Sequence, residues 1–156
     1  MSIEVTLNGK RGELDAAGDE MLLDALRRAG LTSVRMSCGV GACGACTVLL
    51  DGEPVSSCLL LAELARGRAI ETVEGLADNA VQRAFDELGA FQCGFCTPGM
   101  ILTAKHLLVE NPRPTRDEIR EHLNGNICRC GCYPRIERAI ERARDAGQPI
   151  SPTTPT

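Results

Sequence analysis

Two hydrophobic patterns divide the chain of 156 residues. Apolar and polar residues alternate from Ile3 to Leu7, which predicts a strand with one buried face. The turn-forming pair Asn8-Gly9 follows, so residues 3–15 are expected to form two antiparallel strands. In the second half, apolar residues recur every three or four positions, which is typical of helices that bury one face.

The rest of the first half is expected to complete a small α+β domain. Asp19 is placed to cap a helix over residues 20–29, and Gly30 would end that helix. After a loop rich in cysteine, the pattern predicts a hairpin over residues 47–56, a short helix at 59–66 and a strand at 69–74.

The second half is expected to be wholly helical. Thr97-Pro98 marks a helix start, where the missing N–H of proline costs nothing. Thr115 and Glu118 form a capping box for a later helix. The four helices are expected near residues 81–88, 97–108, 115–125 and 134–143.

The change of pattern predicts a domain boundary near Gly75. The expected domains are residues 1–75 and 76–146, followed by a tail rich in proline and threonine at 147–156. Domains of about 75 residues are marginally stable without a disulfide or a metal centre. The chain has only four aromatic residues but nine cysteines, so the cysteines are the candidates for providing such a disulfide or metal centre.

Composition and charge exclude several classes of protein. Hydrophobic residues make up 44% and charged residues 24%, which is ordinary for a globular protein and unlike a collagen-like, disordered or membrane-spanning chain. The net charge of -4, without a basic cluster, argues against nucleic-acid binding. No secretory signal is recognisable, so the cytoplasm is the expected compartment. There, cysteines serve in metal or redox sites more often than in disulfides.

The first cysteine group has the spacing C-x4-C-x2-C, with a fourth cysteine after eleven intervening residues. This is the spacing of plant-type 2Fe-2S ferredoxins. The small residues of the loop would let backbone N–H groups point at the cluster sulfurs and raise the reduction potential. The candidate ligands are Cys38, Cys43, Cys46 and Cys58.

Two other interpretations of this loop are weaker. Residues 39–44 match G-x-G-x-x-G, but cysteines interleave the motif and no helix pattern follows, so a dinucleotide site is disfavoured. A structural zinc site of four thiolates is the serious alternative, although such sites usually contain two C-x2-C pairs. The spacing therefore favours an iron-sulfur cluster over zinc.

The second cysteine group pairs C-x2-C with C-x-C across 31 intervening residues. A thioredoxin-like dithiol would need a strand before the first cysteine and would leave the C-x-C unexplained. A site of four thiolates at helix ends would instead join two helix pairs, so metal binding would contribute folding energy. The candidate ligands are Cys93, Cys96, Cys128 and Cys130.

Three stretches of the sequence together resemble a known family. These stretches are Cys38-Gly-Val-Gly-Ala-Cys-Gly-Ala-Cys46, Gln92-Cys-Gly-Phe-Cys-Thr-Pro-Gly99 and Asn126-Ile-Cys-Arg-Cys130. They resemble the iron-sulfur subunit of molybdenum hydroxylases, the xanthine oxidase family, over residues 3–145. The resemblance implies an N-terminal β-grasp ferredoxin domain and a C-terminal four-helix domain, each with one 2Fe-2S cluster. It also implies that Gln92 and Cys130 contact the molybdopterin of a large partner subunit.

The resemblance further implies electron transfer and no substrate site in this chain. Single electrons would pass from the molybdopterin through the cluster of the helical domain and then the ferredoxin cluster. The onward acceptor would be a partner subunit with FAD or a cytochrome with haem. The chain would thus be part of a multi-subunit oxidoreductase that is not inserted in the membrane. A partner in this family sometimes carries an export signal, so a periplasmic complex stays open.

One string departs from the commoner family pattern. After Cys130 the usual residues are Thr-Gly-Tyr, whereas this chain has Gly131-Cys132-Tyr133-Pro-Arg-Ile136. A Gly-Thr-Tyr-Pro-Arg-Ile version resembles the branch of isoquinoline and aldehyde oxidoreductases that can pass electrons to cytochrome, which puts the flavin partner in doubt. Cys132 is expected to be a spare thiol near the cluster, and an alternative ligand is the second interpretation.

The remaining polar candidates carry less weight. Arg129 lies between two candidate ligands and either offsets cluster charge or pairs with a surface carboxylate or a partner. His106 and His122 have no second ligand at metal spacing and are expected to be packed or solvated. No Ser/His/Asp or Cys/His arrangement indicates catalysis by this chain alone. A free-standing two-cluster carrier or redox sensor and a zinc-stabilised interaction module stay open as alternatives.

Overall fold

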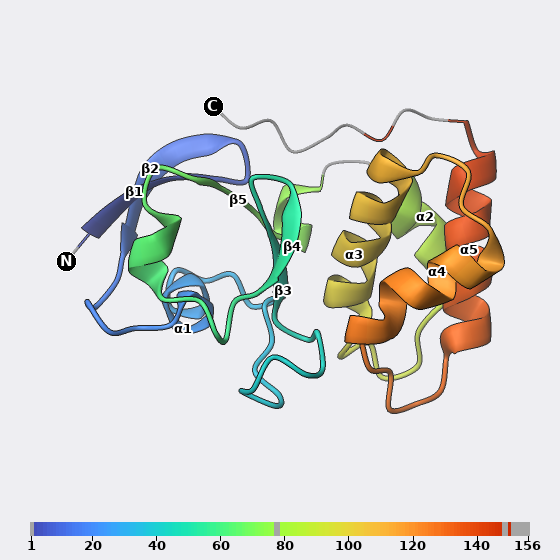
Figure 1. Cartoon of the computed structure of the whole chain (residues 1–156), viewed down its shortest axis with the longest axis horizontal. Helices are drawn as coiled ribbons and strands as arrows, with labels where there is room; N and C mark the ends of the chain where they lie inside the picture. The colour runs from blue at the N-terminus through green and yellow to red at the C-terminus, as the bar shows by residue number, and fades with distance from the viewer. Residues whose placement is uncertain (1, 77–78, 148–149, 151–156) are drawn as a thin grey trace.

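The computed structural model describes residues 2–76, 79–147 and 150. A part built on a β-sheet lies beside a part built of helices (Figure 1). Within the described residues, one sheet contains five strands, which are β1 Ser2–Leu7, β2 Lys10–Asp15, β3 Thr47–Leu50, β4 Glu53–Ser56 and β5 Ala69–Glu71.

The sheet has the strand order β2-β1-β5-β3-β4. The central strands β1 and β5 run parallel, and every other neighbouring pair is antiparallel. Helix α1, Leu22–Arg28, buries its leucines in the same core as Ile3 and Val48. Two hairpins and a last strand that wrap one helix in this way form the expected β-grasp fold.

Both predicted hairpin turns are confirmed. Asn8 and Gly9 have φ angles of 51° and 77°, in the left-handed region that this kind of turn requires. Asp51 and Gly52 repeat the pattern at the second turn, with φ angles of 52° and 93°. The Asn8 side-chain oxygen also accepts a hydrogen bond of 2.8 Å from the N–H of Thr72, just after β5, and the Asp51 carboxylate accepts one of 2.8 Å from the N–H of Ala69 in β5.

The predicted start of the first helix is wrong. The helix begins at Leu22, after Met21, and has no side-chain cap, so Asp19 does not cap it. The neighbouring Glu20 instead accepts a hydrogen bond of 2.9 Å from the N–H of Ala17 and pairs with Arg28. Met21 is held in extended backbone by a bridge to Leu61. This long-range pairing keeps Met21 out of the helix, which therefore begins at Leu22.

Two short elements of the first half are smaller than predicted. The helix expected at 59–66 is a single 3-10 turn, Ala62–Ala65. The strand expected at 69–74 ends at Glu71, because Val73–Gly75 forms another 3-10 turn.

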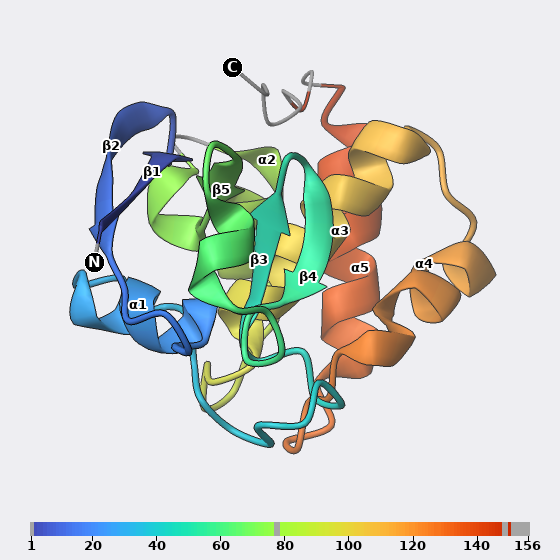
Figure 2. The ribbon, with the colours of Figure 1, turned by 60° about the vertical axis from the view of Figure 1, so that its left-hand side comes forward.

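The second half is helical as predicted. Its helices are α2 Ala80–Glu87, α3 Thr97–Glu110, α4 Arg116–His122 and α5 Tyr133–Asp145, with a 3-10 turn at Leu123–Gly125 after α4. Helix α4 starts with the predicted capping box, in which Thr115 and Glu118 each accept a hydrogen bond from the other's N–H. Figure 2 shows how helices α2, α3 and α5 are arranged. They pack around Phe85 and Met100, which are both fully buried.

Helix α3 also joins the two parts of the molecule. Strand β3 is buried on both faces, because Leu49 belongs to the helical core while Val48 and Leu50 belong to the core of the sheet. The Lys105 ammonium of α3 lies 2.6 Å from the Glu71 carboxylate of β5, and both side chains are largely buried. The His106 ring nitrogen Nδ1 is 3.2 Å from the Gly52 carbonyl oxygen.

The domain limits 1–75 and 76–146 stay predictions. The two hydrophobic cores divide close to the proposed boundary, apart from Leu49. The proposed tail, 147–156, lies outside the described residues except for Gly147 and Ile150. No helix in the described part of the chain is long and apolar enough to cross a membrane.

Candidate metal centres

The β3–β4 hairpin brings the last two cysteines of the first group together. Cys46 precedes β3 and Cys58 follows β4, and antiparallel pairing places Thr47 opposite Ser56. The Ser57 hydroxyl donates a hydrogen bond of 2.7 Å to the Cys46 carbonyl oxygen, which closes this end of the hairpin. The Cys46 and Cys58 thiols hydrogen-bond with each other in a buried position.

The loop before β3 supplies the other two cysteines of this group. The N–H groups of Val40 and Ala42 point at the Cys38 sulfur, at 3.5 and 3.3 Å. These bonds and a bond from the Cys43 thiol lower the pKa of Cys38 to about 6, the bond from Val40 being the largest cause. Gly41 has a φ angle of 72°, and such left-handed positions let the loop curl around the sulfur.

Burial separates the two pairs of thiols. Cys46 is 3% exposed, and its burial raises the pKa of its thiol to about 11. Cys38 is more exposed and has the low pKa described above. A metal centre that binds both thiols must displace a proton from each of them. The proton on Cys46 is held more firmly than the proton on Cys38.

The second cysteine group lies where two helices begin. Cys96 is the residue before α3, and Cys128 and Cys130 lie between the 3-10 turn after α4 and the start of α5. The Cys93 thiol hydrogen-bonds with that of Cys130, and the Cys96 thiol does so with that of Cys128. Burial raises the pKa of Cys96 to about 12, whereas the N–H of Phe95 lowers the pKa of the exposed Cys93.

Each domain thus presents two pairs of thiols. Four cysteine thiolates are the ligand set of a 2Fe-2S cluster, in which two irons each take two of them. In the described ranges, no three His, Cys, Asp or Glu side chains gather closely enough to hold a single metal ion. The paired thiols, with N–H groups aimed at sulfur, fit a two-iron cluster in each domain. The pairs are Cys38 with Cys43, Cys46 with Cys58, Cys93 with Cys130 and Cys96 with Cys128.

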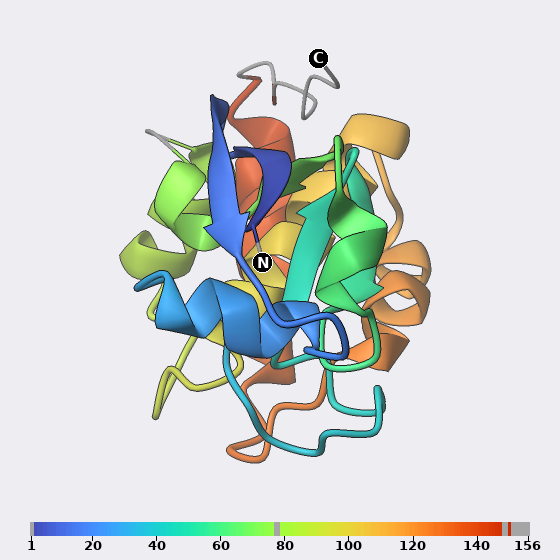
Figure 3. The ribbon, with the colours of Figure 1, turned by 90° about the vertical axis from the view of Figure 1, so that its left-hand side faces the viewer.

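The two cysteine groups lie at the same end of the molecule. Figure 3 shows the loops that carry them side by side below the sheet and the helices. The N–H of Ile127 donates a hydrogen bond of 2.9 Å to the Cys43 carbonyl oxygen. The Asn126 side-chain amide, which is buried, donates one of 3.3 Å to the Gly44 carbonyl oxygen.

Glycine is required where the two loops meet. A Cβ on Gly44 would lie 2.5 Å from the Gly125 carbonyl oxygen, and one on Gly99 would clash with the Gly44 carbonyl. The sequence interpretation did not single out Gly44, Gly99 or Asn126 for this contact. Each lies inside a string that also carries cysteines, and Gly44 is in addition the last glycine of the G-x-G-x-x-G match.

The other predicted residues lie on the surface or in packed positions. Gln92, Arg129 and Cys130 are exposed, and Gln92 directly precedes the exposed Cys93. The packing of His106 and His122 is confirmed, since the rings stack with centroids 5.2 Å apart. The structure brings these two histidines together although they are 16 positions apart in the sequence, which spacing alone did not predict.

Comparisons with known proteins agree with the geometry. The family model described as "2Fe-2S iron-sulfur cluster binding domain" matches residues 5–77, and "2Fe-2S binding domain" matches residues 72–141. The nicotinate dehydrogenase small FeS subunit of Eubacterium barkeri is 47% identical over 92% of this chain and 94% of its own length. The xanthine dehydrogenase iron-sulfur-binding subunit of Escherichia coli O157:H7 is 46% identical over 90% of this chain and 92% of its own length.

A solved structure has the same fold. Quinoline 2-oxidoreductase from Pseudomonas putida 86 contains a chain with a TM-score of 0.89 and 48% sequence identity, and the match covers 94% of each chain. Fold and site therefore define a two-domain 2Fe-2S protein, with a β-grasp ferredoxin domain before a helical cluster-binding domain. The chain belongs to the iron-sulfur small subunits of the molybdenum hydroxylases, the xanthine oxidase family.

Proposed function

We propose that the chain relays single electrons from a molybdopterin centre in a large partner subunit to an onward acceptor. The observation that carries this proposal is the hydrogen bond from the Ile127 N–H to the Cys43 carbonyl oxygen. This bond connects the backbones of the two cysteine groups, because Ile127 directly precedes Cys128 and the acceptor is the carbonyl oxygen of Cys43 itself. A short path through bonded atoms between two redox centres is what a relay requires.

The proposed ligands are the two groups of four cysteines. Those of the ferredoxin domain are Cys38, Cys43, Cys46 and Cys58, and those of the helical domain are Cys93, Cys96, Cys128 and Cys130. A bound 2Fe-2S cluster accepts and releases one electron at a potential that hydrogen bonds and burial adjust. The protein contributes by holding the thiolates in pairs, by donating N–H groups to sulfur and by shielding one side of each group from water.

The exposed edge of the helical group favours the entry of electrons at that point. Cys93 and Cys130 form its exposed thiol pair, whereas Cys128 is buried. Gln92 is exposed beside Cys93, so Gln92 and Cys130 are available to contact the molybdopterin of the large subunit. The ferredoxin group would then pass electrons outward, to a subunit with FAD or to a cytochrome with haem.

Within the enzyme complex, the role of this chain is electron transfer. The relatives named above are subunits of dehydrogenases for nicotinate and xanthine, and the large subunit would bind the corresponding substrate here. We place the complex in the cytoplasm, or in the periplasm where a partner carries the export signal.

Purification of the tagged chain from its native host tests this function. We expect a large subunit in about equimolar amount, whose oxidised pterin is identified by its fluorescence. Recovery of the chain alone, with both clusters bound, would favour a free-standing electron carrier or redox sensor. A matched purification with Gln92→Ala should retain both clusters and slow their reduction by the complex.

A further inference from the structure

The segments that carry the cysteines contain very few charged side chains. All nine cysteines lie in four segments without any Asp or Glu, which are residues 29–50, 54–62, 88–104 and 123–134. The charged residues of these segments are Arg35 and Arg129, and both are cations. The whole chain has 21 acidic residues, so their absence from these segments leaves only positive side chains close in sequence to the proposed ligands.

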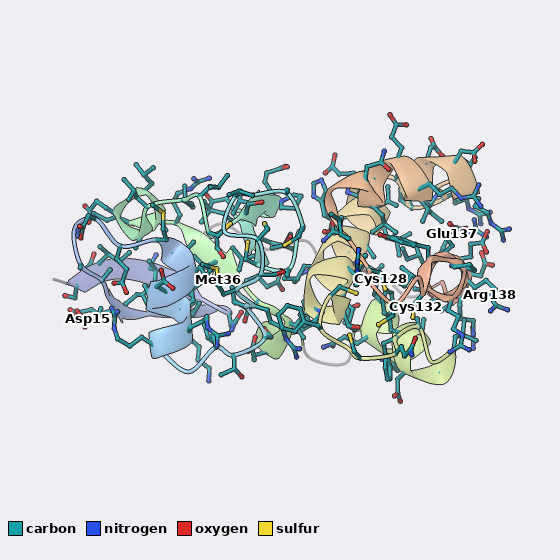
Figure 4. All side chains as sticks on the ribbon, turned by 90° about the horizontal axis from the view of Figure 1, so that it is seen from below. Asp15, Met36, Cys128, Cys132, Glu137 and Arg138 are labelled. Carbon is teal, nitrogen blue, oxygen red and sulfur yellow. The ribbon has the colours of Figure 1, made fainter. Side chains whose placement is uncertain are left out.

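Arg35 connects the loops of the two cysteine groups. Its backbone belongs to the ferredoxin loop, where its N–H donates a hydrogen bond of 3.2 Å to the Ala45 carbonyl oxygen. Its guanidinium carbon lies 5.1 Å from the centre of the Phe95 ring, which belongs to the C-x2-C of the helical group. Figure 4 labels Met36, which follows Arg35, in the sheet part of the molecule and Cys128 in the helical part. A cation of one domain therefore lies against the ligand loop of the other.

No neighbouring carboxylate neutralises this cation. Among the residues that the structure describes, Arg35 forms no ion pair. Glu74 reaches the same loop but accepts a hydrogen bond of 2.9 Å from the N–H of Ser33. The face of an aromatic ring attracts a guanidinium group and stacks with it. The Phe95 ring thus holds the guanidinium in place without cancelling its charge.

A cation held near a redox centre favours the reduced form of that centre. Reduction adds one electron, and therefore one negative charge, to a cluster whose four thiolates already make it anionic. The attraction between the cation and this added charge decreases with distance and with screening by salt. Phe95 lies directly before Cys96 and two positions after Cys93, so the attraction should be strongest at the helical group.

We propose that Arg35 of the ferredoxin domain raises the reduction potential of the helical cluster, with its guanidinium positioned by the Phe95 ring. Its place in the sequence, three residues before Cys38, would instead assign it to the ferredoxin cluster. A higher potential at the helical cluster favours the transfer of electrons from the large subunit. The inference rests on the proposed function, since Cys93 and Cys96 must ligate a cluster.

Variants of the full chain with its clusters test the proposal. Arg35→Gln and Arg35→Met remove the charge, whereas Arg35→Lys keeps it. Arg68→Gln is the charge-matched control, because Arg68 pairs with Asp51 at the turn of the β3–β4 hairpin, and the cysteines lie at the other end of that hairpin.

The midpoint potential of each cluster is the quantity to measure. A titration with dithionite, which supplies the electrons, is followed by electron paramagnetic resonance. The signal that is lost in Cys93→Ser identifies the helical cluster.

We expect Arg35→Gln and Arg35→Met to keep their iron and to bind the added electron about threefold to tenfold more weakly at the helical cluster. A tenfold change corresponds to a potential about 59 mV lower for a one-electron couple. The change at the ferredoxin cluster should be smaller. Arg35→Lys and Arg68→Gln should each stay within about twofold of the wild type at the helical cluster.

A double-mutant cycle tests the role of the ring. Phe95→Leu leaves the charge of Arg35 but removes the surface on which the guanidinium stacks. Arg35→Gln should therefore lower the helical potential less in the Phe95→Leu chain than in the wild-type chain, since the cycle isolates the coupling of the two residues. An equal effect in both chains would show that the ring does not position the charge.

Three other results would overturn the inference alone. The first is an unchanged helical potential in Arg35→Gln or Arg35→Met with the iron retained, and the second is a larger change at the ferredoxin cluster than at the helical one. The third is loss of the helical cluster in both charge-free variants, which would make Arg35 a residue for cluster assembly. A wild-type chain that binds no iron would overturn the proposed function as well, so the two failures are distinguishable.

Discussion

The Ile127 N–H donates a hydrogen bond of 2.9 Å to the carbonyl oxygen of Cys43. Ile127 directly precedes Cys128, so this one bond joins the backbones of a proposed ligand segment in each domain. Asn126 adds a second link, because its side chain donates to Gly44 and accepts a hydrogen bond of 3.0 Å from the Thr103 hydroxyl. The backbone therefore sets the separation of the two proposed centres.

Gly44→Ala should disturb this junction. The φ angle of 69° and the nearby Gly125 carbonyl oxygen both oppose a Cβ there. The left-handed backbone costs about 1–2 kcal/mol, and the overlap should add about 1–3 kcal/mol and slow electron transfer between the centres. Gly67→Ala is the matched control, because Gly67 has a φ of 72° and nothing within 4 Å of the added Cβ.

Chemical denaturation and the rate of electron exchange between the clusters measure these effects. An equal loss of stability in the Gly44→Ala and Gly67→Ala variants would show that the close approach at Gly44 contributes nothing.

The ion pair of Lys105 and Glu71 should hold the two domains together. The Lys105 side chain is 5% exposed and the Glu71 side chain 13%, so Lys105→Met removes the cation from a largely buried carboxylate. We expect a loss of about 3–5 kcal/mol in the free energy of unfolding. Arg66→Met, at an exposed ion pair with Glu63, should cost much less, because water and salt screen exposed charges. Similar losses for the two variants would contradict this account.

The stability of the chain should fall in mild acid, in part because of His122. Burial, followed by the charge of His106, lowers the pKa of His122 below its ordinary value. The unfolded chain binds a proton near pH 6.5, whereas the folded chain resists it, so stability is lost as the pH falls through that value. His122→Gln should therefore show a smaller decrease in melting temperature between pH 7.5 and 5.5 than the wild type. An identical decrease in both proteins would rule out this contribution.

Single replacements should remove one cluster each. Cys38→Ser is expected to halve the iron content by loss of the ferredoxin cluster, and Cys93→Ser by loss of the helical cluster. Iron analysis and visible absorption measure the result, and the spectrum of the remaining cluster should be unchanged. Retention of full iron in either variant would remove that residue from the proposed ligand set.

The features predicted correctly from the sequence are local ones. The Asn8-Gly9 turn and the Thr115 capping box depend on residues within three or four positions, and the structure has both. Cysteine spacing also indicated two separate groups. In the first group the paired cysteines lie in one loop or at the two ends of one hairpin, whereas the pairs of the second group join segments on either side of α3 and α4.

The features that were missed depend on distant contacts. Asp19 is a suitable cap residue, but the bridge between Met21 and Leu61 decides where the first helix begins. The contact of Asn126 with Gly44 and the stacking of His106 on His122 arise only when separate segments meet. No pattern confined to one segment could have predicted them.

Spin counting by electron paramagnetic resonance tests the central claim most directly. The wild-type chain, fully reduced with dithionite, should contain roughly four irons and give two distinguishable signals that together integrate to about two spins per chain. A single signal of about one spin, or zinc in place of iron, would contradict the account of two 2Fe-2S clusters in one relay.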